Sequence, residues 1–149
     1  MATLSVEHSA ASAAIARRSV ATAFEEAGLT SDQAFDAALI ASELVGNAVR
    51  HGRPLPSGRI TIEWSLSAEG YYIAVTDGGN PPSVAPKSAE THDTSGRGLM
   101  IVAALSQDWG VLHQDNTTTV WAQAPLFPAA TPIQVMESTT PGLRVAQFG

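Results

Sequence analysis

The sequence predicts an α+β two-layer sandwich, in which helices pack on one face of a mixed, mostly antiparallel sheet. Three observations carry this prediction. Apolar residues recur at helical spacing over the first third of the chain, they alternate with polar residues over 59–66, and a further helix and a hairpin follow over 98–123. The short turn after the first predicted strand makes its pairing with the next strand antiparallel.

The chain of 149 residues has the composition of a folded domain, with 44% apolar and only 15% charged residues. Its formal net charge of −6 argues against direct binding to nucleic acid phosphates. The absence of cysteine excludes disulfides, thiolate metal sites and thiol nucleophiles. No secretory signal pattern and no membrane-spanning apolar stretch are found, so a cytoplasmic protein without membrane contact is expected.

Two amphipathic helices are expected first. The Ala-rich stretch 6–27 has apolar residues at steps of three and four, and Gly28 would end this helix. Thr30 and Gln33 form a capping-box pattern that opens a second helix, which runs to about His51. We expect Gly52 to supply a left-handed stop there.

The hydrophobic period then changes from 3.6 to 2. Arg59–Leu66 and Tyr71–Thr76 are predicted to form two strands joined by a turn. A helix over Gly98–Gln107 and a hairpin of 111–114 with 117–123 around Asp115 and Asn116 follow. The Pro-rich residues 125–149 are interpreted as a tail that is flexible or loosely docked, which leaves 1–124 as a single domain.

A long loop and two polar clusters are the candidates for function. The Pro- and Gly-rich loop 77–96 has the length of a lid or a binding segment. In the second helix, Asp36, Glu43, Asn47 and Arg50 fall within about 60° of arc at 100° per residue, as a solvated face or a ligand-facing stripe would.

Asp77 follows a predicted strand and precedes two glycines, which is typical of a turn but also suits a ligand that approaches the backbone. Gly96 and Gly98 lead into a helix N-terminus, where backbone N–H groups and the helix dipole favour a phosphate. The common phosphate-loop and dinucleotide fingerprints are absent. The four histidines show no metal-site spacing, so no zinc is expected.

Four segments in this order resemble the motifs of the GHKL (Bergerat-fold) ATP-binding superfamily. They are ELVGNAVRHG over 43–52, VTDGG over 75–79, SGRGLMIV over 95–102 and TVWA over 119–122. The resemblance covers about residues 10–124, and it is greatest to the bacterial anti-sigma-factor serine/threonine kinases of partner-switching circuits.

The resemblance implies that the polar stripe faces Mg-ATP. Asn47 would complete the Mg²⁺ shell through its amide oxygen, and Glu43 would act as the general base toward a substrate hydroxyl. Asp77 would accept the adenine amino group, Gly79 would permit close contact, and Thr119 would support the adenine end. The loop 80–95 would be the ATP lid. The other implied ATP-binding residues are Arg50, Gly96, Arg97, Gly98 and Leu99.

Three departures from the family pattern bear on catalysis. Residues 115–118 replace the usual glycine and lysine of the fourth motif, and Gly46 stands where threonine is common. Thr94 and Ser95 occupy the stretch where related kinases carry an arginine, and Arg97 is the candidate replacement for that cation.

Two hypotheses therefore remain. The first is a serine/threonine kinase that uses Mg-ATP to phosphorylate a small anti-sigma-factor antagonist and that sequesters a sigma factor in its other state. The second is a non-catalytic ATP-binding module that sequesters a partner. The resemblance also implies a homodimer.

Overall fold

The computed structural model describes residues 1–79 and 94–126, with side chains described from Gly98 onward in the second range. The predicted lid therefore lies outside the described residues apart from its last two positions. The predicted tail lies outside them beyond Leu126.

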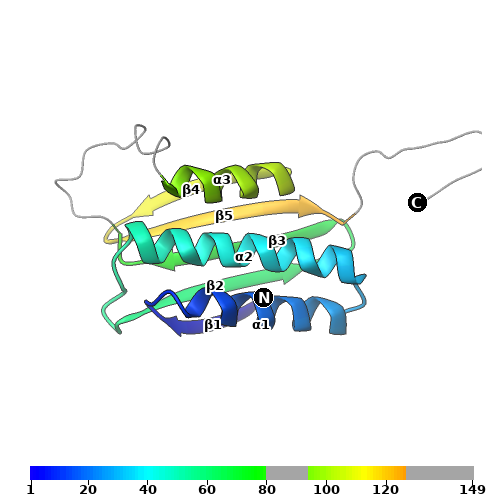
Figure 1. Cartoon of the computed structure of the whole chain (residues 1–149), viewed down its shortest axis with the longest axis horizontal. Helices are drawn as coiled ribbons and strands as arrows, with labels where there is room; N and C mark the ends of the chain where they lie inside the picture. Colours follow the sequence, from blue (N-terminus) through cyan, green and yellow to red (C-terminus); the bar gives the residue numbers. More distant parts are fainter. Residues whose placement is uncertain (80–93, 127–149) are drawn as a thin grey trace, which may run out of the picture.

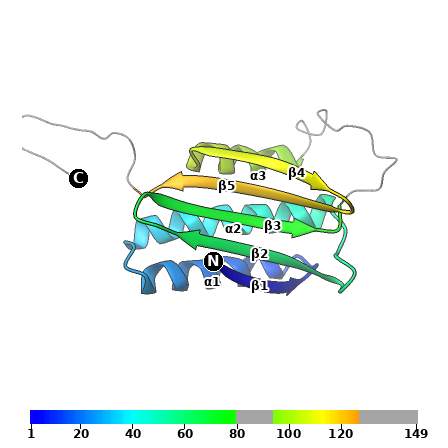
Figure 2. The same ribbon diagram turned by 180° about the vertical axis from the view of Figure 1, so that it is seen from behind.

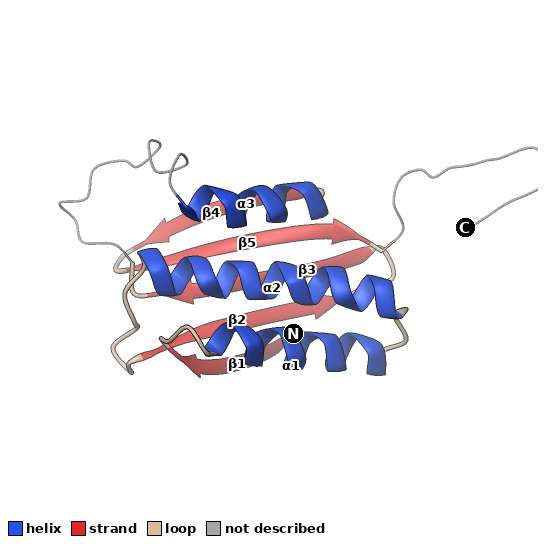
Figure 3. Ribbon diagram, in the orientation of Figure 1, coloured by secondary structure: helices blue, strands red, loops and turns tan. Residues whose placement is uncertain are grey.

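Five strands and three helices make up the described chain, and all three helices cover the same face of one sheet (Figures 1 and 3). Figure 2 shows the other face of the sheet, which none of these helices covers. The strand order is β1-β2-β3-β5-β4, and each neighbouring pair is antiparallel. The α+β class with helices on one face is confirmed, and the described sheet is antiparallel rather than mixed. The elements are β1 (Ala2–Glu7), α1 (Ser12–Glu26), α2 (Ser31–His51), β2 (Arg59–Leu66), β3 (Gly70–Asp77), α3 (Thr94–Leu105), β4 (Asp108–Gln114) and β5 (Thr117–Pro125).

Strand β1 corrects the prediction of one helix over 6–27. Residues 2–7 pair with β2, with Leu4 opposite Ile62 and Val6 opposite Ile60, and the helix begins only at Ser12. Apolar and polar residues alternate over 2–7, but the Ala-rich pattern that follows concealed this short signal. β1 therefore forms an edge of the sheet that the sequence did not predict.

The boundaries of α2 agree with the prediction at both ends, but the reason for its end differs. Thr30 and Gln33 form the predicted capping box, with Gln33 N–H donating to Thr30 Oγ1 at 3.1 Å and Thr30 N–H donating to Gln33 Oε1 at 2.9 Å. Gly52, however, is extended, with φ −99° and ψ 177°, so the expected left-handed stop is wrong. Glycine is required there for space, as shown below.

The remaining helix and strands are of the predicted types, but most of them begin or end at other residues than predicted. β2 has the predicted bounds, and β3 extends the predicted strand by one residue at each end. Strands β4 and β5 form the predicted hairpin, and Asp115 in its turn has φ 54°. α3 begins at Thr94 rather than Gly98, so Gly96 and Gly98 both lie inside the helix.

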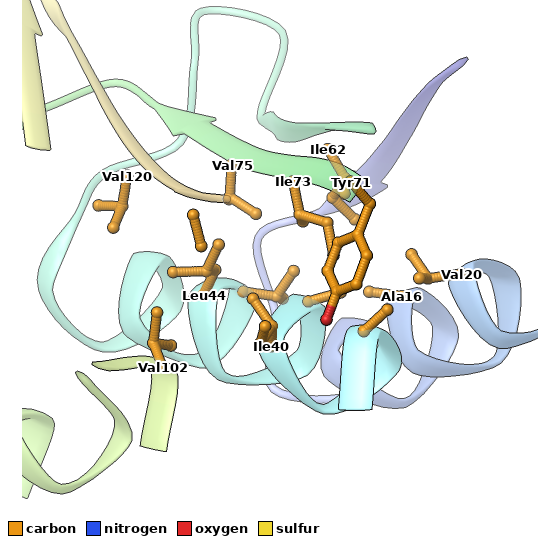
Figure 4. Packing of buried hydrophobic residues seen from close by; sticks show 14 of the residues in the cluster. Ala16, Val20, Ile40, Leu44, Ile62, Tyr71, Ile73, Val75, Val102 and Val120 are labelled. Atoms are coloured by element: carbon orange, nitrogen blue, oxygen red, sulfur yellow. The ribbon is translucent and has the colours of Figure 1, made fainter. Parts of the chain in front are cut away.

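The core lies between the sheet and the helices (Figure 4). Ile62, Ile73 and Val75 point from the sheet toward Ile40 and Leu44 of α2, and these five side chains are buried. Of the apolar residues on the opposite side of α2 from the polar stripe, Ala34, Ala38, Ala41 and Val45 are buried as well, and Val49 is half-buried. The long helix α2 is thus fixed against the sheet along its length. No described helix is long and apolar enough to cross a membrane.

We predict that Thr30→Ala lowers the free energy of unfolding by about 1 kcal/mol, because it removes the side-chain acceptor at the start of α2. Differential scanning calorimetry provides the measurement. Ser31→Ala, at the exposed next position, is the matched control and should change stability little. Equal destabilisation by both variants would contradict the role of the capping box.

Candidate functional site

One end of the sandwich gathers the C-terminal half of α2, the end of β3, the start of α3 and the β4–β5 turn (Figure 1). A Cβ added at Gly79, after β3, would lie 3.2 Å from the Asn116 carbonyl oxygen in that turn. A Cβ added at Gly98 of α3 would lie 2.8 Å from Glu43 Oε1 of α2. Segments from three of the four predicted motifs therefore meet here, together with the turn that precedes the fourth.

Asp77 is a buried carboxylate at the centre of this end, with 4% of its surface exposed. Its Oδ1 accepts a hydrogen bond of 2.6 Å from the Gly79 backbone N–H. Its Oδ2 lies so close to Gly52 that a Cβ on that residue would overlap it. Gly52 is therefore needed because the carboxylate occupies the space of a side chain.

Burial raises the pKa of the Asp77 carboxyl above its ordinary value, because removal from water disfavours the charged form. The Gly79 N–H and the nearby His8 and His113 act in the opposite direction and lower this pKa. The net shift is upward. The charged Asp77 carboxylate therefore lowers the stability of the folded state, which is typical of a functional group.

The backbone after β3 is tied to the segment after α2. Arg53 N–H donates to the Gly79 carbonyl at 3.1 Å, and Gly78 N–H donates to the Arg53 carbonyl at 2.6 Å. Gly79 has φ 83°, a conformation that glycine adopts without strain. Together these bonds place the exit of α2 beside Asp77.

The two adjacent threonines of β5 lie on opposite faces of the sheet. Thr118 is the register partner of Asp77, is buried and accepts or donates a hydrogen bond of 3.1 Å with His113 Nδ1. Thr119 is paired with Thr76, and their hydroxyl oxygens are 2.7 Å apart. Because side chains alternate along a strand, Thr119 points away from the helices and Asp77.

Thr119, which is expected at the adenine end, therefore lies on the opposite face of the sheet from Asp77. The threonine that shares a face with Asp77 is Thr118, whose Oγ1 lies 3.6 Å from a Cβ position on Gly79. Strand alternation from Asp77 through its pairing partner is the signal that distinguishes the two threonines.

The polar stripe of α2 divides into two parts. Glu43 and Asn47 are half-buried, and Arg50 is exposed. The Arg50 guanidinium folds back along the helix, where its Nη2 would lie 3.5 Å from a Cβ on Gly46 and 3.8 Å from one on Gly98. Asp36 lies near the other end of α2. There, burial of the Tyr71 hydroxyl and, less strongly, the negative charge of Asp36 raise the pKa of Tyr71 to about 12.

Gly98 is buried and lies beside Glu43 and Arg50, as the predicted site requires. Leu99 is half-buried and packs against the hydrophobic core, which is the simplest explanation for an apolar residue there. Gly96 and Arg97 belong to the first turn of α3, and their side chains are outside the described set.

Metal binding at this end would depend on a bound ligand. Within residues 1–79 and 94–126, no three His, Cys, Asp or Glu side chains form a group that could hold a metal ion. Carboxylate and amide oxygens are nevertheless the ligands that Mg²⁺ prefers, and this ion usually takes only one or two of them from a protein. The Asn47 amide oxygen, one helical turn after Glu43, fits a Mg²⁺ ion that a nucleotide's phosphates carry.

A cavity lies at the opposite end of the sheet. Its volume is about 260 Å³, and it is lined by the end of β2, the start of β3 and the end of β5, including Ser65, Tyr72 and Gln123. It contains none of the predicted site residues. It provides an internal comparison for any experiment that locates a ligand.

Substitutions at Gly46 of α2 and at Gly52, the residue after this helix, should have opposite effects on stability. Gly46→Ala should raise the free energy of unfolding by about 1 kcal/mol, since alanine is the better helix former and its Cβ makes ordinary contacts. Gly52→Ala should lower it by about 1–3 kcal/mol, because the new methyl group displaces the Asp77 carboxylate. Urea unfolding measures both, and stabilisation by Gly52→Ala would contradict the packing described.

Asp77→Asn should be more stable than the wild type at pH 7. The pKa of the Asp77 carboxyl is higher in the folded state than its ordinary value of 3.8. The protonated carboxyl therefore stabilises the fold when the pH is below 3.8, and this contribution is lost as the pH rises through the folded-state pKa. The advantage of the amide should therefore shrink as the pH is lowered toward 4. Thermal unfolding between pH 4 and 7 tests this, and a less stable variant at pH 7 would contradict it.

Comparisons with known proteins identify the family of the chain. The family model described as "Histidine kinase-like ATPase domain" matches residues 6–124, which include all four motifs. No curated protein sequence matches the chain significantly.

Among solved structures, the chain is similar to the RsbU and RsbW domains of Rv1364c from Mycobacterium tuberculosis, with a TM-score of 0.62 and 20% identity. The match covers 83% of this chain and 32% of that one, so our chain spans about a third of that structure. At this identity the likeness concerns the fold. The family match over residues 6–124 goes further, and the chain belongs to the histidine kinase-like ATPase domain family.

Proposed function

We propose that the chain is an ATP-binding regulatory protein whose nucleotide site lies at the Asp77 end of the sandwich. The observation that carries the proposal is the buried Asp77 carboxylate, held by Gly79 and accommodated by Gly52, on the same end as Asn47 and Glu43. Membership of an ATPase domain family supports the ligand class. A buried acceptor at the end of the central strand fits the exocyclic amino group of adenine.

In this proposal Asp77 accepts a hydrogen bond from the adenine amino group, and Gly79 lets the base approach the backbone. Thr118 replaces Thr119 as the threonine of the adenine end, because it shares the face of Asp77. Asn47 contributes its amide oxygen to a Mg²⁺ ion whose other ligands are phosphates and waters. Arg50 and the first turn of α3, which includes Gly96 and Arg97, face the phosphates, and Gly98 follows that turn beside Glu43.

We further propose phosphotransfer to a protein serine or threonine, with Glu43 as the general base. Glu43 is half-buried, lies one helical turn before Asn47 and contacts the start of α3 through Gly98. Bound Mg²⁺ would neutralise developing phosphoryl charge, and the chain would supply the orientation and the proton acceptor. The substrate would be a small anti-sigma-factor antagonist, and a sigma factor would be the second partner.

The second candidate function is a module that binds ATP and sequesters a partner without phosphotransfer. Thr94 and Ser95 at the start of α3 favour it, since an arginine is expected there in the related kinases. Glu43→Gln separates the two candidates once a phosphorylated partner is identified. A kinase should lose phosphotransfer by about 10²–10⁴-fold and keep ATP binding, whereas unchanged transfer would exclude Glu43 as the base.

The direct test of the proposed function is calorimetric titration of ATP into the protein, with and without Mg²⁺. We expect binding that depends on Mg²⁺, is abolished by Asp77→Asn and is weakened by Asn47→Ala. Circular dichroism of the variants controls for folding. Absence of ATP binding by the folded wild type would overturn the proposal.

The adjacent threonines of β5 provide a matched pair. Thr118→Val should weaken ATP binding by about tenfold through loss of one hydroxyl near the adenine end, and Thr119→Val should leave it within about twofold. Both changes keep the side-chain volume and lie on the same strand. The opposite ranking in the same titration would restore the assignment of Thr119 and contradict the face of the sheet proposed here.

A further inference from the structure

His8 connects the edge of the sheet to the far end of α2. It lies one residue beyond β1 and is half-buried. Its Nε2 is 3.2 Å from the Ala48 carbonyl oxygen and 3.1 Å from the Gly52 carbonyl oxygen. Both partners can only accept hydrogen bonds, so Nε2 carries the proton and donates to both.

The two carbonyls belong to the last turn of α2 and to Gly52, the residue after it, which adjoins Asp77. Ala48 is in the last turn of α2, where carbonyl groups have no hydrogen-bond donor within the helix. Besides the His8 ring, its oxygen accepts a hydrogen bond of 2.9 Å from the N–H of Gly52, which follows the helix. Gly52 is the residue against which the Asp77 carboxylate packs. His8 therefore holds the backbone on which the position of this carboxylate depends.

A second observation links His8 to the same group. Burial raises the pKa of the Asp77 carboxyl, and the charge that His8 carries when it is protonated acts in the opposite direction and lowers it. β1 is two strands away from β3 in the sheet order, so this link crosses the fold rather than following the sheet. His8 thus contacts the site from an element that carries none of the four motifs.

We propose that His8 is a positioning residue for adenine recognition, which holds Gly52 against Asp77 through the bifurcated Nε2–H hydrogen bond. The inference rests on the proposed function, because it assumes that Asp77 accepts the adenine amino group. Its geometric part concerns the protein alone and can be tested without nucleotide.

Ser12 provides a control at the same junction. Its buried hydroxyl donates to the Glu7 carbonyl at 2.6 Å, so it fixes the connection between β1 and α1. Its hydroxyl bond stays within that connection, whereas the His8 bonds reach α2. Ser12→Ala should therefore loosen the junction without disturbing Asp77 directly.

The first test uses NMR of the full chain without ligand. Nitrogen-15 shifts should show that the neutral His8 ring carries its proton on Nε2. The Gly79 amide donates to Asp77 Oδ1, so its hydrogen exchange reports on this contact. In His8→Ala, the exchange rate of this amide, divided by the rate of global opening, should rise several-fold. In Ser12→Ala, the same ratio should not change. An Nδ1–H tautomer, or equal effects of the two variants on Gly79, would overturn the inference.

The second test compares ATP with inosine triphosphate, which carries an oxygen in place of the adenine amino group. His8→Ala should weaken ATP binding about tenfold and leave inosine triphosphate binding within twofold, while Ser12→Ala should change neither. Equal losses for both nucleotides would reduce His8 to a structural residue and overturn the inference. If the wild type bound neither nucleotide, the proposed function itself would fail, whatever the NMR result on His8.

Discussion

The contact between the Asp77 carboxylate and Gly52 is the constraint on which the functional end depends. It brings the exit of α2 within van der Waals distance of the end of β3, and the backbone bonds between Arg53 and the glycines after Asp77 fix that arrangement. A side chain at position 52 would separate the helix from the carboxylate. Because Gly52 has no Cβ, the polar stripe of α2 and the end of β3 can lie next to each other at this end of the fold.

Keeping a carboxylate buried at this point works against the stability of the fold. Burial raises the Asp77 pKa, and the Gly79 N–H compensates for only part of the lost hydration. An amide would fill the same space without a charge. In the proposed function, this group, which destabilises the unliganded protein at the meeting point of the family motifs, binds the ligand.

Local signals in the sequence were sufficient for most of the fold. The capping box at Thr30 and Gln33 and the alternation in β2 act between near neighbours, so they predicted element ends correctly. β1 was missed because its stability comes from pairing with residues more than fifty positions away. The expected left-handed stop at Gly52 is wrong because Asp77, which requires the small size of that residue, is distant in sequence. Thr118 and Thr119 lie on opposite faces of β5, since a one-residue shift reverses the face of a strand, and only the pairing of β3 with β5 shows which of them faces Asp77.

The most direct measurement of the central claim is an amide chemical-shift map of the protein during titration with Mg-ATP. The account predicts that the largest changes fall on Asn47, Gly79, Gly98 and Thr118, at the end of the sandwich where Asp77 is buried. Changes confined to the opposite end, around the cavity lined by Ser65, Tyr72 and Gln123, would show that nucleotide binds elsewhere and would contradict the account.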